Sequence, residues 1–96
     1  MQVVIRNYSG RGAKGLFDSL EKHAADVQTL MRSVKGFVSY TLARNSGGGF
    51  TVTVCQDQAG IDESIHKAKD WIAKNAGNTG VAAPQVSEGT VILHVK

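Results

Sequence analysis

Four residues of this sequence carry side chains that could do chemistry on a bound organic molecule: Asn7, His23, Tyr40 and Trp71. The amide of Asn7 could orient a carbonyl or a dioxygen-derived group, and the imidazole of His23 could act as a general base. The hydroxyl of Tyr40 could reach a bound molecule, and the indole of Trp71 could stack on a flat aromatic ring. These four are the candidate catalytic residues.

Each candidate also has a purely structural interpretation. An Asn at the end of a strand commonly makes a turn hydrogen bond, and a partly buried His commonly hydrogen-bonds within the fold. A Tyr or Trp beside apolar neighbours usually packs in the core or in an interface. The sequence alone leaves both interpretations open for all four residues.

The histidines and the cysteine do not form a metal-binding pattern. His23, His66 and His94 lie far apart, and none has the short spacing at which residues of one helix or strand bind one ion together. Cys55 is the single cysteine, which excludes an intrachain disulfide and a site with several thiolates. We therefore predict no metal and no other cofactor, and a free thiol fits a reducing, cytoplasmic location.

Length and composition predict one folded domain over residues 1–96. The chain is 42% hydrophobic and 20% charged, which is the balance of a globular protein. Its net charge is +3, but the Lys and Arg residues are scattered, so the charge does not favour a nucleic-acid partner. No long apolar run precedes Arg6, so we predict neither a signal peptide nor a membrane partner.

The first half of the chain predicts a strand followed by a long helix. A β-branched run gives a strand over residues 3–8, which ends where turn residues begin. Apolar residues then recur at spacings of three and four over residues 13–33, the pattern of one amphipathic helix of about five turns. Gly36 is suited to end that helix in the left-handed conformation.

The second half predicts a hairpin, a second helix and a last strand. Apolar and polar residues alternate over residues 37–44 and 50–55, on either side of a Gly-rich loop. Helical spacing returns over residues 61–76. Alternation over residues 90–95 then predicts the final strand.

The resulting βαββαβ order predicts an α+β, ferredoxin-like fold with a four-stranded antiparallel sheet and two helices on one face. To the helix side we assign Val3, Ile5, Val38, Tyr40, Leu42, Phe50, Val52, Val54, Val91, Leu93 and Val95. To the open face we assign Val4, Arg6, Tyr8, Phe37, Ser39, Thr41, Thr51, Thr53, Cys55, Ile92 and His94. Such a mixture of aromatic, apolar and small polar residues suits a protein interface, so we expect a homodimer through the open face.

An RNA-recognition domain has the same order of elements, and Lys35-Gly36-Phe37 is similar to the start of one of its motifs. That motif belongs on the third strand, whereas this tripeptide opens the second. Val4 also stands where a stacking aromatic residue would be expected. We therefore predict no nucleic-acid binding.

A long Leu-rich helix that leads into Val34-Lys35-Gly36-Phe37-Val38-Ser39-Tyr40, followed by a close hairpin and a second helix with Trp71, resembles the antibiotic-biosynthesis-monooxygenase-like dimeric α+β barrels. The resemblance covers nearly the whole chain and implies that two protomers pack sheet against sheet. Members include cofactor-independent oxygenases of polycyclic aromatic substrates and haem-degrading oxygenases.

The haem-degrading branch uses an Asn on the first strand, a Trp, and a His from the second helical region. Asn7 and Trp71 match the first two, but residues 80–83 stand where that His would be. The resemblance therefore does not extend to haem degradation. It implies a homodimer that binds a small hydrophobic or aromatic molecule, either as a cofactor-independent monooxygenase or as a non-catalytic structural or regulatory dimer.

Overall fold

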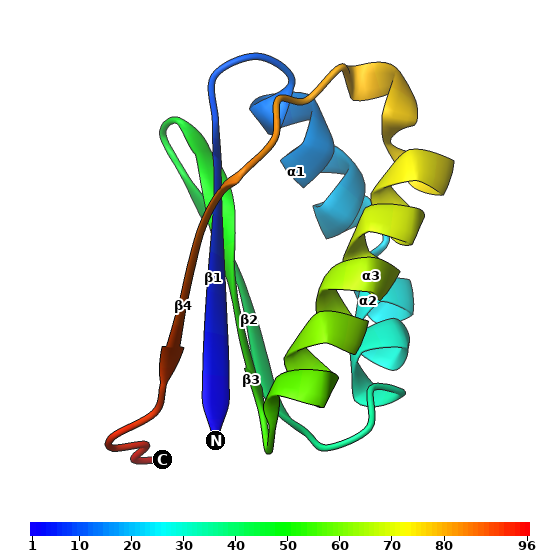
Figure 1. Cartoon of the computed structure of the whole chain (residues 1–96). Coiled ribbons are helices and arrows are strands. Elements are labelled where there is room, and N and C mark those ends of the chain that lie inside the picture. The colour runs from blue at the N-terminus through cyan, green and yellow to red at the C-terminus, as the bar shows by residue number, and fades with distance from the viewer.

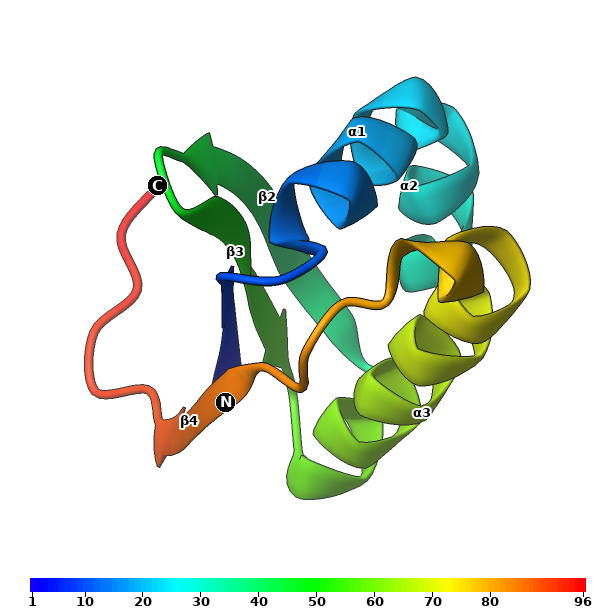
Figure 2. The ribbon, with the colours of Figure 1, turned by 90° about the horizontal axis from the view of Figure 1, so that it is seen from above.

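A computed structural model describes residues 1–96 and has the predicted order of strands and helices. Its four strands form one antiparallel sheet in the order β2-β3-β1-β4, and the helices cover one face of it (Figures 1 and 2). The elements are β1 (Gln2–Ser9), α1 (Ala13–Lys22), α2 (Ala24–Arg32), β2 (Phe37–Asn45), β3 (Gly48–Cys55), α3 (Gln58–Asn75), the short 3-10 helix η1 (Gly77–Thr79) and β4 (Gln85–Thr90). The predicted ferredoxin-like fold is confirmed.

Local sequence explains where the helices begin and end. The Asp57 carboxylate accepts a hydrogen bond from the Gly60 backbone N–H at 3.0 Å and caps the start of α3. Gly36, with a φ of 76°, follows α2 in the left-handed conformation predicted for it. Gly12 has a φ of 77°, and a Cβ there would lie 2.5 Å from Val81 Cα, so only glycine lets this turn pack against the loop before β4.

The prediction of one continuous helix over residues 13–33 is wrong, because the helix breaks at His23. His23 has a φ of −109° and a ψ of 28°, outside the helical range, and it joins the end of α1 to the start of α2. Its Nδ1 lies 2.9 Å from the Ser19 carbonyl oxygen. The break interrupts the line of buried side chains along the helix. Leu20 and Val27 are buried, whereas Ala24 between them is exposed.

The last strand was also predicted at the wrong place. β4 ends at Thr90, whereas the prediction began there. Thr90 pairs with Gln2, at the very start of β1, so residues beyond Thr90 have no neighbouring strand within the chain. Ile92, Leu93 and Val95 are 98%, 80% and 79% exposed, and this tail lies on the side of the sheet away from the helices (Figure 2).

The assignment of side chains to the two sheet faces is inverted for β1 and β3. Val4, Arg6 and Tyr8 are buried beneath the helices, together with residues of β3 predicted on the open face: Thr51, Thr53 and Cys55. Because side chains alternate along a strand, Val3 and Ile5 face away from the helices, with their partners Val54 and Val52. The open face is therefore more apolar than predicted.

In β2 the two faces are correct for Tyr40 and Leu42 but not for Phe37. The register shifts between Phe37 and Ser39, so one extra residue interrupts the alternation. Phe37 consequently packs against both buried clusters of the helix side.

None of the helices combines the length and the apolar composition that crossing a bilayer requires.

Candidate ligand-binding pocket

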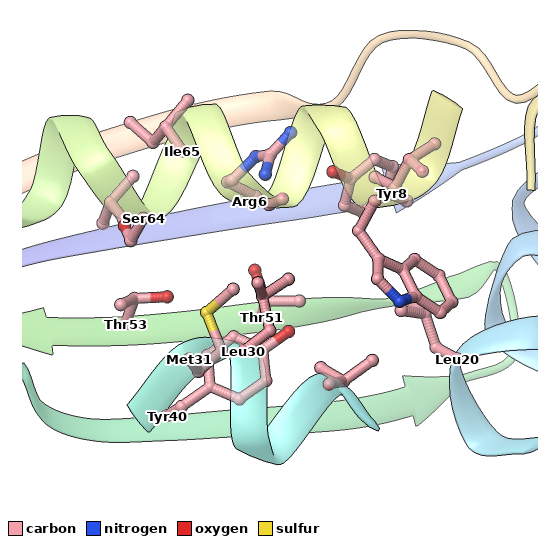
Figure 3. A pocket seen from close by; sticks show the side chains of 15 residues that line it. Arg6, Tyr8, Leu20, Leu30, Met31, Tyr40, Thr51, Thr53, Ser64 and Ile65 are labelled. Atoms are coloured by element: carbon pink, nitrogen blue, oxygen red, sulfur yellow. The ribbon is translucent and has the colours of Figure 1, made fainter. Parts of the chain in front are cut away.

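A pocket lies between the helix-covered face of the sheet and the helices (Figure 3). The sheet contributes a polar floor, whereas α1, α2 and α3 contribute mainly apolar side chains. The lining residues are Val4, Arg6, Tyr8, Leu20, Val27, Leu30, Met31, Tyr40, Thr51, Thr53, Ser64, Ile65, Ala68, Trp71 and Ile72. An apolar enclosure with a few convergent polar groups is the usual form of a small-molecule site.

Arg6 is the one charged residue among those lining the pocket. It is only 5% exposed, and its Nε is buried with no hydrogen-bond partner. Its guanidinium carbon lies 5.5 Å from the centre of the Tyr8 ring, a cation–π contact between neighbours on one face of β1. No ion pair connects Arg6 to a carboxylate.

Four hydroxyl groups accompany Arg6 on the floor of the pocket. Tyr8 comes from β1, Thr51 and Thr53 from β3, and Tyr40 from β2 on the far side (Figure 3). None of these hydroxyls takes part in a side-chain hydrogen bond within the chain. The floor thus presents a cation and several hydroxyl groups that are free to bind a ligand.

Burial raises the pKa of both tyrosines of the pocket above the ordinary tyrosine value, which itself lies well above neutral pH. Loss of solvation raises the pKa of Tyr40 to about 12, an effect that neighbouring Tyr8 increases and Arg6 partly offsets. Burial raises the pKa of Tyr8 as well, again against the effect of Arg6. Both hydroxyls therefore remain hydrogen-bond donors over the physiological pH range.

The raised pKa of Tyr40 predicts a loss of stability in alkali. The folded state holds the Tyr40 proton up to about pH 12, whereas the unfolded state releases it near pH 10. Between these values the unfolded state binds fewer protons, so stability is fully present below pH 10 and declines by about 2 kcal/mol as pH rises towards 12. Urea unfolding at a series of pH values should show this decline, and Tyr40→Phe should reduce it. An equal decline in the Tyr40→Phe variant would contradict the assignment.

The pocket is narrow and is separated from a surface groove by shared side chains. Its cavity volume is about 30 Å³, whereas a cavity that holds benzene is on the order of 150 Å³. The groove between α2 and β2 has a volume of about 440 Å³. Val27, Met31 and Tyr40 line both spaces, so movement of these three side chains would join them.

The structure places two of the four predicted site residues in the pocket. Tyr40 and Trp71 line it from opposite layers. Asn7 is on β1 between Arg6 and Tyr8 and therefore faces the other side of the sheet, opposite Phe50. His23 is not among the lining residues either, so the four candidates do not form one cluster.

His23 does not line the pocket, but its ring contacts Trp71, which does. The two rings meet edge to face, with centroids 5.8 Å apart and an angle of 69° between their planes. A donated Nδ1–H bond to the Ser19 carbonyl fixes the imidazole at the helix break. His23 is thus placed to orient the Trp71 ring.

Sequence reasoning missed Arg6, Tyr8, Thr51 and Thr53 as pocket residues because it assigned them to the open face. The run Val3-Val4-Ile5 has no alternation that would reveal which face is covered. The sequence did contain one signal for this side of the strand, which was Arg6: a charged residue in the middle of a β-branched strand requires a polar partner or a function.

Cys55 is buried, and the pKa of its thiol is raised, first by burial and then by nearby Asp57 and Glu63.

No protein-family model and no curated protein matches the sequence of this chain. Solved structures do match its fold. The haem degrader MhuD from Mycobacterium tuberculosis superposes with a TM-score of 0.69 at 20% identity over 100% of both chains. A proposed antibiotic biosynthesis monooxygenase from Chloroflexus aurantiacus gives 0.62 at 18% identity, covering 99% of this chain and 95% of that one.

A dimeric ferredoxin-like protein from an uncultured marine organism gives a TM-score of 0.65 at 10% identity, covering 99% of this chain and 95% of the other. The chain has the fold of the antibiotic-biosynthesis-monooxygenase-like proteins. At such identities the likeness shows the backbone fold alone.

The residues of the pocket do not fit haem. No histidine lines it, and the raised pKa of Tyr40 works against the phenolate that would bind iron. No cluster of three or more His, Cys, Asp or Glu side chains is placed to hold a metal ion.

Proposed function

We propose that the pocket binds a small aromatic molecule and that the protein oxygenates this molecule with dioxygen, without metal or flavin. The observation that best supports this proposal is the apolar pocket with its polar floor. Tyr40 lines this pocket from the sheet and Trp71 lines it from the helices. Trp71 would stack on the ring of the substrate, and the Tyr40 hydroxyl would donate a hydrogen bond to its oxygen. His23 would act as a positioning residue, because it contacts Trp71 and not the pocket.

The proposed reaction converts a phenol into a quinone. The phenol loses its proton to solvent water, and the electron-rich phenolate passes one electron to dioxygen. The two radicals combine at a ring carbon, the peroxide takes the proton back from water to give a hydroperoxide, and loss of water breaks the O–O and C–H bonds. One dioxygen is consumed for each quinone and each water formed, and the substrate supplies all the electrons.

An oxygen electrode and absorbance spectroscopy test this proposal with 1-naphthol as the probe. We expect oxygen uptake equal to 1,4-naphthoquinone formation, unaffected by a chelator. Trp71→Ala and Tyr40→Phe should each lower kcat/KM by about 10-fold or more, whereas exposed His66→Ala should not. Binding of 1-naphthol without oxygen uptake would overturn the oxygenase proposal.

A non-catalytic, regulatory binding protein is the second candidate. It is favoured by one observation: no Asp, Glu or His lines the pocket, so the chain supplies no general base to a bound phenol. An oxygenase of this construction would rely on a substrate that ionises readily. The absence of turnover with 1-naphthol, combined with tight ligand binding, would support this second function.

We also propose that two copies pair through the open sheet face. Ile5 and Val52 are direct neighbours there, and Ile5 is 39% exposed in one protomer. The apolar tail after β4 lies on the same side (Figures 1 and 2). A second copy would cover both surfaces and leave the pocket on the opposite side of the sheet, as a homodimer with two separate sites.

A further inference from the structure

Arg6 carries a positive charge that no carboxylate in the chain neutralises; its one charge-compensating contact is the cation–π contact with Tyr8. A guanidinium stays protonated in proteins, and a buried charge without a partner is strongly unfavourable. Yet Arg6 is nine-tenths buried, its Nε has no partner, and no carboxylate lines the pocket around it. Glu88 on the adjacent strand is exposed and accepts a hydrogen bond from Gln58 at 3.1 Å, so it does not neutralise Arg6.

We propose that the ligand of this pocket is a singly charged aromatic anion whose oxygen atoms bind Arg6. This inference rests on the proposed function and specifies the class of ligand that the pocket binds. The planar guanidinium offers N–H donors that match an oxyanion. The protonated hydroxyls of Tyr8 and Tyr40 can donate to the same oxygens.

The rest of the pocket defines the remainder of the ligand. Beyond the polar floor the walls are apolar, with Trp71, Leu20 and Ile72 among them. These walls would take an aromatic ring and would exclude a second charged group. One cation therefore selects one negative charge, attached to an apolar body.

Nuclear magnetic resonance tests this directly, because Trp71 is the only tryptophan and gives a single indole N–H signal. Benzoate, benzamide and acetate are titrated into the labelled protein, and the Trp71 indole and Arg6 Nε–H signals are followed. Benzoate and benzamide have the same ring but differ in charge, whereas acetate has the charge without the ring. We expect benzoate to bind at least about 10-fold more tightly than either of the other two.

Substitution of Arg6 separates charge from shape. Arg6→Gln should bind benzoate and benzamide equally, and Arg6→Lys should retain part of the preference for benzoate. Arg44→Gln is the matched control, because Arg44 is a surface residue paired with Asp18 at 3.0 Å. That control should keep the wild-type preference.

The outcomes distinguish this inference from the proposed function. If benzoate and benzamide bind the wild-type pocket equally, the pocket accepts aromatic molecules but the anion proposal is overturned. If acetate binds as tightly as benzoate, the aromatic part is overturned. If none of the three moves the Trp71 signal, the pocket is not a ligand site and the proposed function fails with it.

A further arm distinguishes a phenolate from a carboxylate. 4-Nitrophenol absorbs visible light only when ionised, so its pKa on the protein can be read by absorbance. Arg6 should lower the pKa of bound 4-nitrophenol, and Arg6→Gln should abolish that shift. A lowered pKa assigns phenolates to the site, whereas an unshifted pKa with a retained benzoate preference restricts the site to carboxylates.

Discussion

Replacing Arg6 with methionine is expected to make the protein more stable, by about 1–3 kcal/mol in the free energy of unfolding. Methionine keeps an unbranched apolar stem in this buried position but removes a charge that has no carboxylate partner in the chain. The same substitution should abolish the preference for benzoate over benzamide. Gain of stability with loss of anion binding is the signature of a residue kept for function.

Urea unfolding of both proteins at one fixed concentration checks this prediction, since the stability of an associating protein depends on concentration. Arg44→Met is the matched control. Arg44 is partly exposed and pairs with Asp18 and Glu21, so its loss should cost about 0–1 kcal/mol. Destabilisation by Arg6→Met would show that the Arg6 charge supports the fold itself.

Introducing a charge at Ile5 is expected to abolish the proposed dimer. Ile5 lies on a central strand of the open face, beside Val52. In a symmetric dimer Ile5→Glu would bury two unpaired carboxylates, one from each copy, and raise the dissociation constant by about 1,000-fold or more. Sedimentation equilibrium at micromolar concentration should then find monomers in place of dimers.

The control for Ile5→Glu adds the same charge elsewhere. Ala73 is exposed on α3, on the helix side of the molecule, so Ala73→Glu should leave the dissociation constant unchanged. Monomeric Ile5→Glu should remain folded by circular dichroism, since this side chain lies outside the buried clusters. A wild-type protein that sediments as a monomer, or an Ile5→Glu variant that still dimerises, would contradict pairing through this face.

The order of the elements could be predicted from sequence because it rests on local signals. Gly36 stops a helix, and the Gly-rich loop before Phe50 joins two alternating segments. The break at His23 could not be predicted, because the apolar spacing runs through it. α1 packs on β3 and β1 whereas α2 packs on β2, so the break separates two segments that contact different strands, which local spacing cannot reveal.

The two sheet faces could not be assigned from alternation alone. Alternation in β3 separates Val52 from Thr51 and Thr53 but does not reveal which set faces the helices. The apolar set was expected inside, yet the polar set forms the floor of the pocket. When one face of a sheet lines a polar pocket floor and the other is apolar, the usual rule of apolar inside and polar outside does not predict which face the helices cover.

The sequence assigned Tyr40 to the helix side, and the structure places both Tyr40 and Trp71 in the pocket on that side. Asn7 was grouped with them as a candidate site residue, but its neighbours Arg6 and Tyr8 occupy that side of β1. A shift of one residue in the assumed phase of a strand moves every side chain to the other face. One such error accounts for both the misplaced Asn7 and the missed Arg6.

The wall of Val27, Met31 and Tyr40 between pocket and groove affects how quickly a ligand can bind. A ring larger than the pocket interior passes this wall only while the side chains are displaced, and Met31 is the most adaptable of the three. Association would then be limited by opening of the wall. The observed binding rate should therefore level off at high ligand concentration, and a smaller residue at position 31 should raise that plateau.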